Sequence, residues 1–156
     1  MLNNNRHSWS RREIKNVLAA MAVGVAVAAC GGTAASTPPK PNTVTMTAQN
    51  GSGVSGTAEV VKANASFTLT VKLTGMTPGS IHVSHVHAGG CSHPGGIVYK
   101  LTSVVADSSG VATTTTIVPA EYLVPASGWY VNIHFGPDFT EAEYAPSISC
   151  GDLQAA

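Results

Sequence analysis

Basic residues are scarce in this sequence beyond its first fifteen positions. Only four lysines follow Lys15, and neither Lys nor Arg occurs after Lys100. Recognition of nucleic acid needs a basic patch or stripe, so the sequence gives no support to that function. Enzyme signatures are sparse as well, because no serine lies in a Gly-x-Ser-x-Gly context and no recognisable motif pairs two carboxylates.

Long hydrophobic runs are also missing. The apolar stretch Val17 to Ala29 has 13 residues, whereas a membrane-spanning helix needs about 20. This stretch follows a basic segment with three arginines and Lys15, and small residues lead from it into Cys30. The order of charge, apolar run and small residues predicts a cleaved signal peptide over residues 1–29, with a retained membrane helix as the alternative.

The end of this segment, Val27-Ala28-Ala29-Cys30, resembles a bacterial lipobox. The resemblance implies that Cys30 is lipidated and anchors the mature protein to a membrane of the bacterial cell envelope, on a face that the sequence leaves open. Ser10 to Lys15 also resembles a twin-arginine export signal, so the export route stays open too. Residues 30–42 contain three prolines and no apolar periodicity, which predicts a flexible tether.

Cysteine is rare, and its few copies are informative. The chain has three cysteines, and a lipid on Cys30 leaves only Cys91 and Cys150 in a compartment where disulfides persist. We therefore expect Cys91 and Cys150 to pair. Residues 30–156 hold 4 basic and 7 acidic side chains, a formal charge of −3. Their length is typical of one domain, and the sequence is silent on oligomeric state.

Apolar residues that recur with period two dominate the rest of the chain. In residues 65–74, Phe67, Leu69, Val71 and Leu73 face one way while Thr and Lys face the other. No helical period follows the signal segment, so residues 43–156 are predicted to form an all-β sandwich of about eight strands. The other predicted strands, separated by Gly-, Pro- and Ser-rich turns, are 43–49, 54–62, 81–88, 97–105, 111–118, 129–135 and 147–153.

Five histidines follow the signal segment and gather in three places. His85 and His87 share one face of a predicted strand, His82 points to the opposite face, and His93 follows in the next loop. His134 ends a later strand whose large apolar side chains take the core face, so we expect its ring to be exposed. Imidazoles without a free thiolate suit Cu(II) or Zn(II), and the affinity order favours copper. The spacing alone also allows ordinary surface or packing histidines.

A family resemblance adds to this pattern. Gly75 to His87 resembles the copper-zinc superoxide dismutase segment G-L-x-x-G-x-H-G-F-H-V-H, with all three histidines in register. Cys91-Ser92-His93-Pro94 looks like a shortened form of the family's path from its disulfide cysteine to its bridging histidine. Residues 104–112, 130–134 and 148–151 are similar to a family hairpin, the strand of the fourth copper ligand and the C-terminal disulfide motif.

The resemblance covers about Val54 to Leu153 and implies a Greek-key β-sandwich that carries one copper ion. It implies His85, His87, His93 and His134 as the copper ligands.

Two further residues take supporting roles by the same resemblance. Asp138 falls where the family has an aspartate that orients a ligand imidazole. His82 would support the site from behind, although packing alone explains it equally well.

The chain departs from the dismutase pattern at the zinc site. Only Pro94-Gly95-Gly96 separates His93 from the next predicted strand, and Lys100 stands in place of the zinc aspartate. We therefore expect no zinc. Ser147 stands where the family has the arginine that attracts superoxide. Acidic residues crowd the neighbouring loop and would repel an anionic substrate: Asp138, Glu141 and Glu143.

A second resemblance points elsewhere. Ser84 to Gly89 and Trp129 to His134 also resemble chordin-type (CHRD) domains, which carry H-x-H and Y-V-N-x-H at related places in a similar sandwich. The G-E-I-R-G motif that normally ends those domains is lacking. Three hypotheses follow: a copper-only site that dismutes superoxide, a non-catalytic copper buffer or carrier, and a structural envelope lipoprotein. The expected partners are the membrane and superoxide or a copper ion.

Overall fold

Buried and more exposed side chains alternate along the strands of this domain, as in β3 (Phe67–Thr74). The computed structural model describes residues 40–155; the predicted signal peptide, Cys30 and most of the predicted tether lie outside them. Every second residue of β3 is buried, beginning with Phe67, while the threonines and Lys72 between them are more exposed. One face of the strand thus enters the core and the other meets solvent.

The remaining regular structure is almost entirely strand. Besides β3 it comprises β1 (Asn42–Ala48), β2 (Ser55–Lys62), β4 (Ile81–His82), β5 (Ser84–Gly90), β6 (His93–Lys100), β7 (Val104–Val105), β8 (Ala112–Val118), β9 (Trp129–His134), β10 (Ser147–Leu153) and a 3-10 turn, η1 (Ala142–Tyr144).

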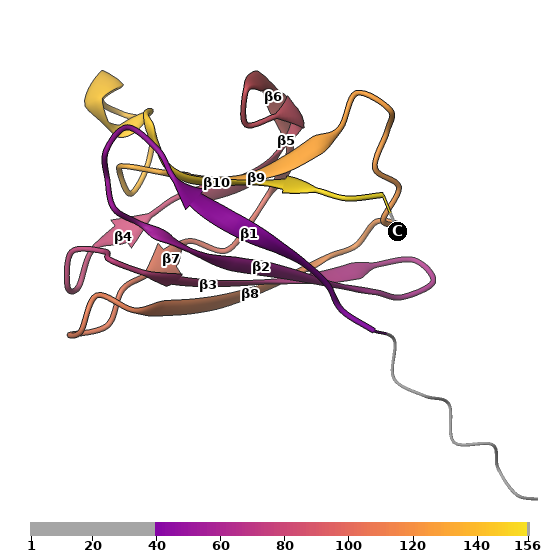
Figure 1. The fold of residues 1–156 in the computed structure, drawn as a ribbon, viewed down its shortest axis with the longest axis horizontal. Helices are drawn as coiled ribbons and strands as arrows, with labels where there is room; N and C mark the ends of the chain where they lie inside the picture. Colours follow the sequence, from indigo (N-terminus) through magenta and orange to yellow (C-terminus); the bar gives the residue numbers. More distant parts are fainter. Residues whose placement is uncertain (1–39, 156) are drawn as a thin grey trace, which may run out of the picture. The chain divides into compact units, whose positions relative to one another are not determined.

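Eight of these strands form one curled antiparallel sheet in the order β6-β5-β9-β10-β1-β2-β3-β8, with the small β4–β7 pair beside it (Figure 1). Strand β1 joins two layers, because Asn42 to Met46 pair with β2 while Thr47 and Ala48 pair with β10. The last strand therefore lies beside the first strand of the β1-β2-β3 meander, which is a Greek-key arrangement. The prediction of an all-β sandwich is confirmed.

Two predicted strands are interrupted in the structure. Residues 81–88 divide into β4 and β5 at Val83, whose N–H donates to the carbonyl of Gly136 and whose carbonyl accepts from the N–H of His134. Residues 97–105 divide into the end of β6 and β7. The break at Val83 lets the two ends of residues 81–88 join different sheets.

The core lies between the two layers and is apolar. Phe67 packs edge to face against Tyr99 and Tyr122, and Trp129 packs in the same way against both tyrosines. Val131 and Ile133 enter this core from β9, as their alternation predicts. The inner faces of β9 and β5 are therefore fixed by packing, which leaves their outer faces available for other side chains.

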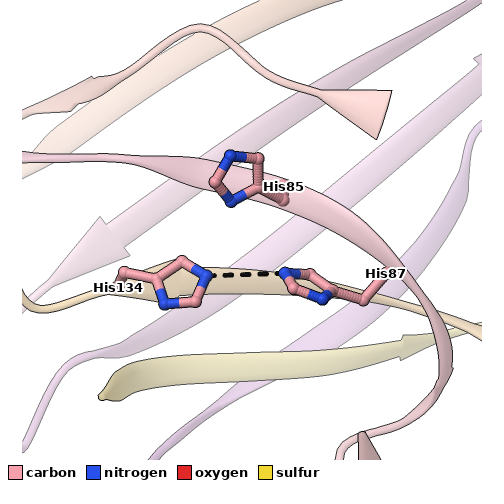
Figure 2. A group of neighbouring side chains, drawn as sticks. All are labelled: His85, His87 and His134. Carbon is pink, nitrogen blue, oxygen red and sulfur yellow. Dashed lines mark hydrogen bonds between the residues drawn. The ribbon is translucent and has the colours of Figure 1, made fainter. Parts of the chain in front are cut away.

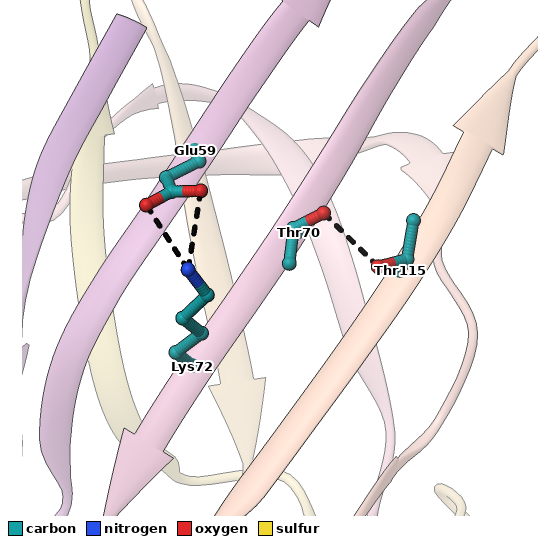
Figure 3. A network of polar contacts seen from close by, with 4 residues as sticks. All are labelled: Glu59, Thr70, Lys72 and Thr115. Atoms are coloured by element: carbon teal, nitrogen blue, oxygen red, sulfur yellow. Dashed lines mark hydrogen bonds and ion pairs between the residues drawn. The ribbon is translucent and has the colours of Figure 1, made fainter. Parts of the chain in front are cut away.

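The outer face of β2, β3 and β8 is polar. Lys72 Nζ lies 3.2 Å and 3.3 Å from the two carboxylate oxygens of Glu59, and the hydroxyls of Thr70 and Thr115 lie 3.0 Å apart (Figure 3). An exposed ion pair of this kind contributes about 0–1 kcal/mol. This layer is held mainly by its buried face.

A disulfide joins Cys91 and Cys150, as the sequence predicts. Cys91 lies in the turn between β5 and β6 and Cys150 lies in β10, so the bond ties the β5–β6 hairpin to the last strand. The carboxylate of Asp152 also accepts the N–H of Cys91 at 2.7 Å. Disulfides persist outside the reducing cytoplasm, so this bond indicates a non-cytoplasmic compartment. No helix among residues 40–155 is long and apolar enough to cross a membrane.

Replacing both Cys91 and Cys150 by Ser should lower the free energy of unfolding by about 2–4 kcal/mol, because the bond closes a loop across a separation of 59 residues. Urea denaturation of the oxidised protein and the double variant measures the difference. Equal unfolding midpoints for the two proteins would contradict a structural role for the disulfide.

Candidate metal centre

Two neighbouring strands bring three histidines together on the outer face of their layer. His85 and His87 are two residues apart on β5 and so share one face of the strand. His134 is the last residue of β9, which pairs antiparallel with β5. In this register His87 lies opposite Tyr130 and His85 opposite Asn132, so His134 lies just beyond them. One ring nitrogen from each histidine lies within 4.8 Å of the others, and the three rings face one another (Figure 2). This group could hold a metal ion.

The expectation that His134 is exposed is wrong, since its exposed fraction is only 6%. Strand alternation places its ring on the outer face, but the segment after β9 folds back over that face. The N–H of Phe135 donates to the carbonyl of Pro146, and that of Gly136 to the carbonyl of Tyr144. The predicted strand 129–135 would place the side chain of Phe135 in the core. That prediction is wrong, because β9 ends at His134 and Phe135 is 54% exposed.

Backbone carbonyls fix the protonation of two of the three rings. His87 Nδ1 lies 2.9 Å from the carbonyl oxygen of Gly95, and His134 Nδ1 lies 2.6 Å from that of Ala145. A carbonyl oxygen only accepts hydrogen bonds, so each Nδ1 must carry the proton. In the neutral rings, both Nε2 atoms then present lone pairs, which is the form that binds a metal.

The lone pairs of these rings converge at a place where few hydrogen-bond donors reach them. The Nε2 atoms of His87 and His134 lie 3.4 Å apart, so two acceptors face each other. Nδ1 of His85 is buried and has no hydrogen-bond partner within residues 40–155. Buried polar atoms in proteins are nearly always paired, and a metal ion would give Nδ1 of His85 a partner. The donor set therefore fits a metal.

Burial and neighbouring charges keep His85 and His134 neutral. The pKa of His85 falls from its ordinary 6.5 to about 4, mainly because the ring is buried and in smaller part because His134, His87 and Lys100 lie nearby. Burial also lowers the pKa of His134, against the opposing effect of its hydrogen bond to Ala145. A ring that resists protonation keeps its lone pair available for a metal.

An aromatic ring covers the cluster from the loop after β9. Phe139 stacks on His85 with ring centroids 5.4 Å apart and meets His134 edge to face at 4.8 Å. Beside it a cavity of about 410 Å³ reaches His85, and Lys100 and Asp138 line this cavity from opposite elements. The cavity beside His85 thus has a cation, an anion and a phenyl ring in its lining.

His82 is buried and lies on β4, not on the strand of His85. Its Nδ1 donates to the backbone carbonyl of His134 at 2.9 Å, and its Nε2 contacts the hydroxyl of Ser80 at 2.8 Å. These bonds anchor the end of β9. The ring of His82 therefore positions the backbone of His134 and does not face the other imidazoles.

His93 and Asp138 lie elsewhere than the predicted roles require. Among residues 40–155 the converging group consists of His85, His87 and His134, while His93 is exposed at the start of β6 with its Nδ1 2.8 Å from the hydroxyl of Ser92. The carboxylate of Asp138 accepts the N–H and the hydroxyl of Thr140 at 2.9 Å and 2.7 Å. Asp138 thus shapes the loop that carries Phe139, and carbonyl groups orient the imidazoles.

Neither a protein-family model nor a curated protein sequence matches this chain. The dismutase and CHRD resemblances thus remain predictions.

The metal-free protein should lose stability as pH falls from 6.5 toward 4. The unfolded chain protonates His85 and His134 more readily than the folded protein, so protons favour unfolding in this window and not above it. Between pH 7.5 and pH 5 we expect a loss of about 1–2 kcal/mol from His85. Urea denaturation of the metal-free protein at both pH values measures it.

The His85→Gln variant should show a smaller loss over the same range, whereas His93→Gln, at an exposed position, should behave as the unmodified protein. Identical pH dependence in the His85→Gln variant would show that burial of this imidazole is not the cause.

Proposed function

We propose that this protein is an exported, membrane-anchored lipoprotein whose β-sandwich holds one copper ion at His85, His87 and His134, and that the site carries out superoxide dismutation. The observation that carries the proposal is the convergence of three imidazole nitrogens. Two are unprotonated Nε2 atoms of rings whose Nδ1 protons are donated to backbone carbonyls, and the His85 ring has a buried Nδ1 with no hydrogen-bond partner within residues 40–155. Imidazole nitrogen is a preferred ligand of copper, which binds more tightly than the other common divalent ions at such sites.

Bound copper would supply a one-electron couple between Cu(I) and Cu(II). Dismutation converts two superoxide radicals and two protons into dioxygen and hydrogen peroxide; copper would carry the electron, and solvent would supply the protons. The chain contributes the orientation of the His87 and His134 rings and the exclusion of most water from all three. Lys100 lines the cavity that reaches His85, and a cation there favours the approach of an anion.

A second candidate function is non-catalytic copper binding, and the cover over the site favours it. Phe139 stacks on His85 and contacts His134, so it hinders approach to two of the three ligands. Asp138, Glu141 and Glu143 add negative charge in the same loop. A covered site in an acidic loop suits a protein that stores or hands on copper, since release would follow movement of one loop.

The purified protein should bind one equivalent of copper tightly, and His87→Ala should lose that binding while the sandwich stays folded. His87 supplies one of the two facing Nε2 atoms, and the core does not depend on its ring. Copper content after removal of loosely bound metal, electron spin resonance and circular dichroism give the readouts.

The His93→Ala variant separates a three-histidine site from the four-histidine site that the resemblance implies. Unchanged copper content and an unchanged spin-resonance spectrum are expected, because His93 lies apart from the converging group. Less than about half an equivalent of copper in the unmodified protein would overturn both candidate functions. Superoxide consumption above that of free aqueous copper distinguishes dismutation from storage.

Removing the phenyl ring over the site should speed the loss of copper. In Phe139→Ala we expect transfer of copper to a competing chelator to be about tenfold faster, because water and chelator reach His85 and His134 more easily. Stopped-flow absorbance of the chelator complex follows the transfer. Phe135→Ala is the matched control, since Phe135 is exposed and makes no stacking contact with these rings. Equal rates in Phe139→Ala and the unmodified protein would contradict the covering role.

A further inference from the structure

The side chain of Asn132 lies inside the imidazole cluster. It is only 5% exposed and lies opposite His85 in the pairing of β5 with β9. Its amide nitrogen is 3.2 Å from Nε2 of His134, and its amide oxygen is in a short hydrogen bond with the hydroxyl of Ser147 on β10. A buried amide is therefore held at both ends beside the candidate ligands.

The tautomer of His134 determines which end of this amide faces the ring. The carbonyl of Ala145 takes the proton of Nδ1, so Nε2 offers only a lone pair. The group opposite that lone pair must be a donor, which makes it the NH₂ of Asn132. The Ser147 hydroxyl then donates to the amide oxygen. Because an amide NH₂ is not a metal ligand, Asn132 stands beside the metal position as a hydrogen-bond donor.

A metal on Nε2 of His134 would remove the acceptor that the Asn132 amide now uses. A buried donor without a partner is unfavourable, and a small anion bound to the metal would offer the amide a new acceptor. We infer that Asn132, held in place by Ser147, donates a hydrogen bond to a small anion bound at the metal. This inference rests on the proposed function. Asn132 would select, as the ligand of that site, an anion that accepts a hydrogen bond.

Azide is the probe, because it is a small anion that accepts hydrogen bonds and gives an absorption band when it binds Cu(II). Copper content is measured first in every protein, and azide is then titrated into the Cu(II)-loaded protein. In Asn132→Leu, which keeps the approximate shape without the donor, the azide dissociation constant should rise about tenfold. In Ser147→Ala, which frees the amide to rotate, it should rise about threefold.

The Ser149→Ala variant is the matched control on β10, because the hydroxyl of Ser149 contacts the carbonyl of Thr47 and not Asn132. It should bind azide as the unmodified protein does. Full copper content with unchanged azide binding in both Asn132→Leu and Ser147→Ala would overturn the inference alone. If Asn132→Leu fails to fold, Ser147→Ala decides the outcome by the same criterion.

Two other results would also be decisive. Loss of copper from folded Asn132→Leu would mean that copper binding itself requires the amide, and the role as a donor to a bound anion would be wrong. An unmodified protein that takes up no copper would overturn the proposed function, and the anion site with it.

Discussion

Two backbone carbonyls, those of Gly95 and Ala145, hold the rings of His87 and His134 by their Nδ1 protons. Each bond fixes both the orientation of a ring and its tautomer, so the Nε2 lone pairs point into one small volume. The carbonyls come from segments that follow each histidine closely in the chain: β6, which forms a hairpin with β5, for Gly95, and the segment after η1 for Ala145. The chemistry of the site therefore depends on the backbone path as much as on the histidines.

That path also buries the cluster, and burial has opposing consequences. Desolvation lowers the pKa values of His85 and His134 and so keeps their lone pairs free, but it removes hydrogen-bonding water from the same atoms. As a result of that burial, Nδ1 of His85 has no hydrogen-bond partner among the described residues. Phe139 extends the cover outward, which favours retention of a metal and restrains exchange with solvent. The loop that carries Phe139 thus favours retention of a metal at the expense of access to it.

Strand periodicity was sufficient to predict the sandwich and the shared face of His85 and His87, because alternation is a local property of the chain. The pairing of Cys91 with Cys150 followed from cysteine count. The burial of His134 could not be predicted, since it results from residues 135–146 folding back, and Phe139 carries no signal in the sequence. Alternation did place Asn132 on the same face as His134, but its role appears only with the hydrogen bonds of Ala145 and Ser147.

The fold presets the protonation of these rings for a metal. Nitrogen-15 NMR of histidine-labelled, metal-free protein at neutral pH tests this preset protonation directly. We expect His87 and His134 to carry their protons on Nδ1, and we expect addition of diamagnetic Cu(I) to shift their Nε2 signals and the Nδ1 signal of His85. Protons on Nε2 of His87 and His134, or nitrogen signals that do not shift when Cu(I) is added, would contradict a preset protonation of these rings.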